Sequence, residues 1–141
     1  MNSKLLIFSL VLLILTACSS NHLIGKWKLD NIDIEKAIAD FPENQKDNMR
    51  MMLKTSLNNM KNKFFIEFND NGKYSIEAAD ENGVLQKKSG TWELSSDKKK
   101  LKTVTEGKEE TVEVVEITAN KLTLNMSSPS QSSFEMSFVP R

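Results

Sequence analysis

The stretch KFFIEFNDNGKYSIEA, from Lys63 to Ala78, decides the fold of this chain. Apolar and polar residues alternate in it on both sides of the dipeptide Asn71-Gly72. Alternation with a period of two indicates a strand with one buried face, and Asn-Gly favours the positive φ angles that a tight hairpin turn requires. The stretch therefore predicts a β-hairpin. The residues on its buried face would be Phe64, Ile66, Phe68, Tyr74, Ile76 and Ala78.

Period-two patterning continues along most of the chain and predicts about six further strands. We expect them at residues 23–34, 84–95, 101–105, 111–118 and 121–126, and around Phe134, Met136 and Phe138. Gly90 is expected to form a bulge or a bend in its strand, because a glycine inside a strand often marks one.

Short polar segments separate these strands and are predicted to be turns or loops. They are residues 80–83, 95–99, 106–110 and 119–120, together with the serine-rich SSPSQSS at 127–133. Glu109 and Glu110 fall in one of these turns, and no second carboxylate is predicted opposite them across an apolar cleft. Catalysis by a pair of acids therefore has no support.

One segment departs from this pattern and predicts a helix over about residues 43–62. Its apolar residues, among them Met52, Leu57 and Met60, recur at the 3.6-residue spacing of an amphipathic helix. Pro42 suits the start of a helix. The helix would be inserted after the first strand, where it is a candidate lid over the strands.

About eight strands joined by tight turns, with one inserted helix, predict a mostly β fold of one domain. An antiparallel up-and-down meander must either expose long edges or close, and closure removes the unpaired edges. We therefore expect a small barrel. Two packed sheets in a sandwich are the alternative, because both architectures share period-two patterning.

The N-terminal segment, residues 1–17, has the composition of a targeting signal. Lys4 provides a positive charge, and Leu5 to Leu15 form an apolar run that is too short to span a membrane. Leu15-Thr16-Ala17-Cys18 resembles the lipobox of bacterial lipoproteins, in which the signal is cut before a cysteine that carries acyl chains such as palmitate. The resemblance implies lipidation of Cys18, the only cysteine of the chain. The alternative is an ordinary secretory signal with a chance cysteine.

The same resemblance implies a place in a bacterial cell envelope. Two or three acyl chains hold a protein on a membrane stably, whereas one chain alone does so only marginally. Residues 18–22 would be the lipidated cysteine and a short tether, and residues 23–141 the folded domain. Ser19, rather than an aspartate, follows the cysteine, which in well-known Gram-negative systems implies the outer membrane, here facing the periplasm.

The composition argues against several classes of function. Lysine and arginine together number 19, as do aspartate and glutamate, so no net field would attract nucleic acid. The single histidine, His22, lies in the tether without a second nitrogen or sulfur ligand, so we expect no metal site. The sequence has neither a glycine-rich phosphate loop nor a nucleophile elbow. We expect a protein without a cofactor or enzymatic activity.

Several short motifs carry a resemblance to a known family. They are Gly25-Lys26-Trp27, Phe68 with Asn71-Gly72-Lys73-Tyr74, Gly90-Thr91-Trp92-Glu93-Leu94 with Asp97 and Leu101, and finally Leu122 and Leu124. Together they resemble the lipocalin-like domains of bacterial envelope lipoproteins over nearly all of the mature chain. The resemblance implies a barrel with Trp27 plugging one end. The sequence departs from the family in the arginine that covers this tryptophan in lipocalins, since the only late arginine is Arg141.

The resemblance implies a binding protein, and two functions remain open. In the first, the barrel interior holds a small hydrophobic ligand. Its candidate contacts are Trp27, Phe64, Ile66, Phe68, Tyr74, Trp92, Leu122, Leu124, Phe134 and Phe138, with Met52 and Met60 of the helix as candidate lid residues. In the second, the barrel is filled by its own side chains and docks on another envelope protein, as an assembly subunit or an inhibitor. An interior cavity well below roughly 300 Å³ would leave little room for a drug-sized ligand.

Overall fold

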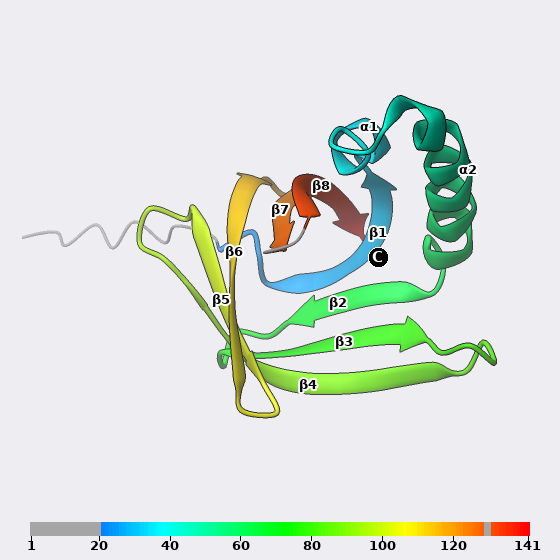
Figure 1. The fold of residues 1–141 in the computed structure, drawn as a ribbon. Coiled ribbons are helices and arrows are strands. Elements are labelled where there is room, and N and C mark those ends of the chain that lie inside the picture. The colour runs from blue at the N-terminus through cyan, green and yellow to red at the C-terminus, as the bar shows by residue number, and fades with distance from the viewer. Residues whose placement is uncertain (1–20, 129–130) are drawn as a thin grey trace, which may run out of the picture.

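The computed structural model describes residues 21–128 and 131–141. These residues form eight strands and two helices (Figure 1). The strands are β1 (Gly25–Ile32), β2 (Phe64–Phe68), β3 (Lys73–Ala79), β4 (Leu85–Leu94), β5 (Lys100–Thr105), β6 (Lys108–Ile117), β7 (Leu122–Ser128) and β8 (Gln131–Pro140). The helices, α1 (Ile34–Ala37) and α2 (Glu43–Met60), both lie between β1 and β2 in the chain. The fold is mostly β, as predicted.

The eight strands form a closed antiparallel meander. Each strand pairs with the next along the chain, and β1 pairs with both β2 and β8. Trp27, for example, lies opposite Ile66 of β2 and Pro140 of β8. This closure confirms the predicted barrel and excludes the two-sheet sandwich, because the first and last strands of a sandwich would belong to open edges.

The hairpin at residues 63–78 is confirmed, but its turn differs from the prediction. Phe64 pairs with Ala78 and Phe68 with Tyr74, and four residues, 69–72, lie between the end of β2 and the start of β3. Of these four only Gly72 has a positive φ, of 75°, and its N–H donates to the Asn69 carbonyl at 3.3 Å. The connection is a four-residue turn closed by a left-handed glycine rather than a two-residue Asn-Gly turn.

Two segments predicted as turns belong largely to strands. β6 begins at Lys108, so Glu109 and Glu110 are strand residues and the β5–β6 turn consists of Glu106-Gly107 alone. Likewise β7 extends to Ser128 and β8 begins at Gln131, so the predicted loop at 127–133 is shorter. Both predictions were wrong for the same reason: backbone hydrogen bonds extend a strand pair regardless of how polar its side chains are.

The helical region is confirmed at α2 and contains one unpredicted element. The strand expected to reach residue 34 ends at Ile32, because Asp33 caps α1 by accepting a hydrogen bond from the Lys36 amide at 3.0 Å. The Lys36 ammonium lies 2.5 Å from Glu135 of β8, which attaches α1 to the barrel. α2 then leads to β2 beside the ends of β1 and β2 (Figure 1), and its buried residue is Leu57.

The described residues form one continuous barrel core. It comprises Leu23, Trp27, Leu29, Leu57, Ile66, Phe68, Tyr74, Leu101, Val114, Leu122, Leu124, Met136 and Phe138. Among the described residues, every strand and every member of this core lies between residues 23 and 140, so we expect the segment 21–141 to fold by itself.

Candidate functional site

The two ends of the barrel differ, and the difference positions the candidate site. At one end, which we call the Trp27 end, the indole N–H of Trp27 donates to the Leu23 carbonyl at 2.8 Å, and both side chains are buried. At the opposite end, which we call the helix end, β1 leads into α1, and α2 returns to β2 (Figure 1). The β3–β4 and β5–β6 turns also lie at the helix end.

An apolar cavity of about 110 Å³ lies inside the barrel toward the helix end. Its lining comes from six strands, β2, β3, β5, β6, β7 and β8. The lining residues are Phe64, Ile66, Phe68, Tyr74, Ile76, Leu101, Thr103, Glu110, Val112, Leu124, Met126, Met136 and Phe138. Because inward-facing positions alternate along each strand, a single cavity collects side chains that are far apart in the sequence.

Aromatic rings form the wall of this cavity on the β2 side. The Phe64 and Phe138 ring centroids are 6.1 Å apart, and the rings of Phe68 and Tyr74 stack at 6.0 Å. Trp92 packs edge-on against Phe68 at 5.7 Å. Such spacings are typical of packed aromatic pairs, which hold their rings in fixed positions.

Two polar residues line the cavity on the side of β5 and β6. Thr103 of β5 and Glu110 of β6 lie opposite each other in register, and both line the cavity. The Lys108 ammonium lies 3.2 Å from the Glu110 carboxylate, and the Tyr74 hydroxyl bonds to the Thr105 hydroxyl. Polar groups therefore gather where β5 and β6 approach their turn.

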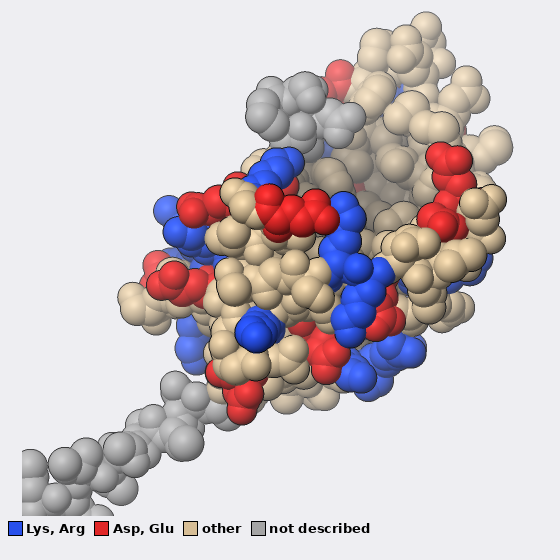
Figure 2. Space-filling model, turned by 90° about the horizontal axis from the view of Figure 1, so that it is seen from below, with Lys and Arg blue, Asp and Glu red and all other residues tan. Residues whose placement is uncertain are grey.

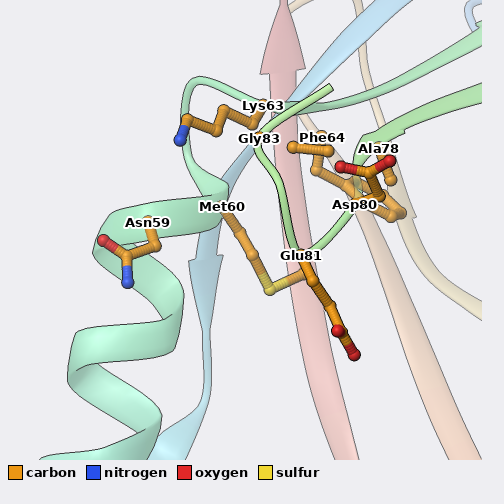
Figure 3. Close-up of a pocket in the computed structure, with 9 residues that line it drawn as sticks. Asn59, Met60, Lys63, Phe64, Ala78, Asp80, Glu81 and Gly83 are labelled. Atoms are coloured by element: carbon orange, nitrogen blue, oxygen red, sulfur yellow. The ribbon is translucent and has the colours of Figure 1, made fainter. Parts of the chain in front are cut away.

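A second, more open hollow of about 440 Å³ lies outside the cavity, between the end of α2 and the β3–β4 turn. Asn59, Met60, Lys63 and Phe64 contribute from the helix side, and Ala78, Ala79, Asp80, Glu81 and Gly83 from the turn. Figure 3 shows Met60 extending from the last turn of α2 toward Glu81. Phe64 lines both spaces, so the hollow and the interior cavity adjoin at this residue.

Asp80 is the carboxylate of this hollow with a clear structural role. It accepts hydrogen bonds from the Val84 and Asn82 amides, each at 2.9 Å, and from the Gln86 side chain at 3.0 Å. The bond from Val84, followed by that from Gln86, lowers the pKa of Asp80. Asp80 is therefore occupied in holding the β3–β4 turn.

The structure brings together six of the residues predicted to contact a ligand. Phe64, Ile66, Phe68, Tyr74, Leu124 and Phe138 all line the interior cavity. The others lie elsewhere: Trp27 and Leu122 are buried in the core, and Phe134 packs against it half-buried. The Trp92 indole N–H donates to the carbonyls of Asn69 and Lys73, at 3.0 and 3.1 Å.

The two predicted lid residues have different surroundings. Met60 lines the outer hollow, whereas Met52 is 55% exposed on α2. Arg141 does not lie over Trp27: its guanidinium carbon is 4.0 Å above the ring of Phe65, which faces outward from β2. Cys18 lies outside the described residues.

Several cavity residues were not predicted from the sequence. Met126, Met136, Val112 and Leu101 could have been found by extending the same alternation along β5 to β8. Thr103 and Glu110 could not, because residues 106–110 were assigned to a turn and a polar residue in a strand is ordinarily placed on its wet face. Only the register of β5 on β6 shows that both face inward.

Two further properties bear on the chemistry of the described residues, 21–128 and 131–141. Neither helix is long and apolar enough to cross a membrane. In the same ranges no three His, Cys, Asp or Glu side chains are grouped so that they could hold a metal ion. On the face shown in Figure 2, basic and acidic side chains are interspersed rather than collected into one patch.

Comparison with known proteins agrees with this architecture. A lipocalin-like protein from Bacteroides uniformis has a TM-score of 0.56 at 14% identity, over 85% of this chain and 99% of that chain. A protein from Bacteroides eggerthii has a TM-score of 0.51 at 13% identity, over 83% and 98% of the two chains. At these identities the likeness concerns the fold. A search of curated protein sequences found no match.

The comparison with sequence families is more specific. The model of the lipocalin-like domain matches residues 23–124, which is most of the chain and includes β1 through the first half of β7. Families with this fold are generally binding proteins rather than enzymes. The chain therefore belongs to the lipocalin-like domain family.

Proposed function

We propose that this protein binds a small apolar molecule, or the apolar part of a larger one, inside its barrel. The observation that supports the proposal is the interior cavity, whose lining is mainly aromatic, aliphatic and methionine side chains from six strands. A barrel filled by its own side chains would place such residues in mutual contact and leave no space of this size.

The cavity volume limits the size of the ligand. At about 110 Å³ it is well below the roughly 300 Å³ of a site for a drug-sized molecule. An engineered apolar cavity of about 150 Å³ holds benzene, so this space suits a single small ring or a short alkyl group. Any larger ligand would extend past Phe64 into the outer hollow.

A pair of matched variants tests the binding site. In Val112→Phe the new ring enters the cavity, whereas in Val115→Phe it enters solvent, because Val112 lines the cavity and Val115 is exposed. We expect toluene to shift the methyl NMR signals of Leu124, Met126 and Met136 in the wild-type segment 21–141 and in Val115→Phe. Val112→Phe should stay folded and lose this response. Absence of any response in the wild type would refute the binding function.

We also propose that Cys18 is acylated and anchors the protein in a bacterial envelope, at the outer membrane facing the periplasm. The support is the sequence Leu15-Thr16-Ala17-Cys18, followed by Ser19. Leu23 is buried at the Trp27 end, and five residues span at most about 17 Å. Acyl chains on Cys18 would therefore hold the Trp27 end near the bilayer and direct the helix end away from it.

Metabolic labelling tests the anchor. Cells supplied with an alkyne analogue of palmitate should label the wild-type chain and not Cys18→Ala, because the sequence contains one cysteine. After fractionation, wild type should accompany the outer membrane and Cys18→Ala the soluble fraction. An unlabelled wild-type protein in the soluble fraction would show that the N-terminal segment is an ordinary secretory signal.

We propose that the protein is not an enzyme and uses no cofactor, consistent with a domain that has no histidine after His22 and no cysteine after Cys18. A second candidate function, docking on another envelope protein, is favoured by Met51 and Met52, which are 69% and 55% exposed on α2. Native mass spectrometry of protein extracted from its own membranes distinguishes the two: a small-molecule adduct supports ligand binding, and a retained polypeptide supports docking.

A further inference from the structure

The polar side of the interior cavity follows from the register of β5 on β6. Inward positions on β5 are Leu101, Thr103 and Thr105, and those opposite them on β6 are Val112, Glu110 and Lys108. Apolar side chains thus give way to polar ones as both strands approach their turn. The change occurs on the strand face that continues the barrel interior, at the end of the hairpin where Glu110 and Lys108 are exposed to water.

Glu110 is placed at an entrance to the cavity. β7 pairs with β6 only from Glu113 to Ile117, so the stretch of β6 that carries Glu110 has no partner in β7. The Glu110 side chain is 57% exposed and also lines the cavity. Its carboxylate therefore lies at the boundary between the apolar interior and water.

The ion pair between Glu110 and Lys108 contributes little to the stability of the barrel. The neighbouring Lys108 ammonium lies 3.2 Å away, but the two side chains are 80% and 57% exposed, and ion pairs this exposed contribute little to stability. An apolar residue at position 110 would instead extend the lining formed by Val112 and Leu124. A ligand can displace Lys108 at little cost, because water would solvate the released ammonium.

On the basis of the ligand-binding function proposed above, we propose that Glu110 selects small apolar amines, with the apolar group in the cavity and the ammonium at the Glu110 carboxylate. The hydroxyl of Thr103, directly opposite in register, can accept a second hydrogen bond from the same ammonium. A ligand with a carboxylate in place of the ammonium would meet the like charge of Glu110 and bind more weakly.

Three probes of nearly equal size test this assignment: benzylamine, toluene and benzoate. Each is titrated into the segment 21–141 at neutral pH, and binding is followed by the methyl NMR signals of Val112, Leu124 and Met136. We expect wild type to bind benzylamine roughly three- to fivefold more tightly than toluene, the gain for a partly exposed charge pair. Benzoate should bind more weakly than toluene.

Glu110→Gln and Glu109→Gln form the matched pair of variants. Both remove one negative charge from β6, but Glu109 faces outward, where its carboxylate lies 3.0 Å from Lys102. Glu110→Gln should reduce benzylamine affinity to that of toluene, improve benzoate binding and leave toluene unchanged. Glu109→Gln should alter the affinity for none of the three probes. A general loss of structure in Glu110→Gln would weaken the binding of all three probes, so it could not weaken benzylamine binding while improving benzoate binding.

The outcomes separate this inference from the function on which it rests. Toluene binding without a preference for benzylamine, or a preference that survives Glu110→Gln, would overturn the role of Glu110 and leave an apolar binding site. Failure of all three probes to bind the folded wild-type domain would instead overturn the binding function.

Discussion

Gly90 shows how a single residue sets the shape of the barrel. β4 pairs with β3 over Leu85–Thr91 and with β5 over Gly90–Leu94, so its two partners overlap only at Gly90 and Thr91. Of the bulge or bend predicted at Gly90, the bulge is absent, because both registers run through Gly90 without a shift. Position 90 requires glycine because neighbouring atoms leave no room for a side chain. A Cβ would lie 2.1 Å from the Val104 carbonyl oxygen and 2.8 Å from Cε1 of Tyr74.

We therefore expect Gly90→Ala to destabilise the domain by about 2–3 kcal/mol, toward the upper end for overpacked sites. The backbone of Val104 cannot move aside without disturbing the β4–β5 pairing. Urea unfolding of the segment 21–141, followed by circular dichroism, measures the change. Ser89→Ala, one residue away on the exposed face, should remain within about 0.5 kcal/mol of wild type. Equal stability of Gly90→Ala and wild type would contradict the close approach.

Residue identity alone predicted the aromatic part of the candidate site but not its polar part. Phe64, Ile66 and Phe68 face inward because they alternate around a recognisable turn, and that signal is local. The orientation of Glu110 depends on where β6 begins, which is set by the Thr105–Lys108 pair across the turn. A polar run such as KEE contains no apolar residue that would indicate which of its side chains face the barrel interior.

At the scale of elements, the turns determine the register of the barrel. The β2–β3, β3–β4 and β4–β5 connections share one design, in which the fourth residue has a positive φ and donates its N–H to the first. These residues are Gly72, Gly83 and Lys98, with φ of 75°, 77° and 58°. The β5–β6 turn has two residues instead, Glu106 and Gly107, with φ of 52° and 79°, as in a type I′ turn.

Glu106 is the residue that suits its turn least. A left-handed conformation costs about 1 kcal/mol for most residues but is tolerated by asparagine, and Asn-Gly is the preferred type I′ pair. Glu106→Asn should therefore raise the free energy of unfolding by about 0.5–1 kcal/mol. The ion pair that it removes, with Lys88 at 4.0 Å, is exposed and contributes little.

The same replacement at Glu109, a strand residue with ordinary backbone angles, serves as the control and should give no gain. Thermal unfolding of both variants compares the two positions. A lower melting temperature for Glu106→Asn than for wild type would show that the left-handed conformation costs Glu106 little.

At the scale of the whole molecule, β8 makes the barrel a closed structure. The family model ends at residue 124, yet β8 pairs with both β7 and β1. β8 also contributes Met136 and Phe138 to the core, and its Glu135 forms an ion pair with Lys36 of α1. Without β8 the meander would have two long unpaired edges and an exposed interior.

A chain that ends at Ser128 should consequently fail to fold. Each large buried side chain is worth about 1.5–3 kcal/mol, and the exposed edges of β1 and β7 favour aggregation. We expect the truncated domain to elute as aggregates in size-exclusion chromatography and to lack a cooperative thermal transition. Removal of Arg141 alone, an exposed residue, should preserve both properties. A monomeric, cooperatively unfolding truncation would show that closure by β8 is dispensable.

The sequence by itself determined the strand content, the order of the elements, the helix after the first strand and most of the apolar cavity wall. These properties depend on alternation and spacing, which are local and can be read along the chain. Only the tertiary structure decided between the expected barrel and the alternative sandwich, and showed that about 110 Å³ remains open inside the barrel and that Glu110 lines this space. Barrel closure, the cavity volume and the inward-facing side of a polar strand depend on pairing between distant segments. No single stretch of sequence therefore determines them.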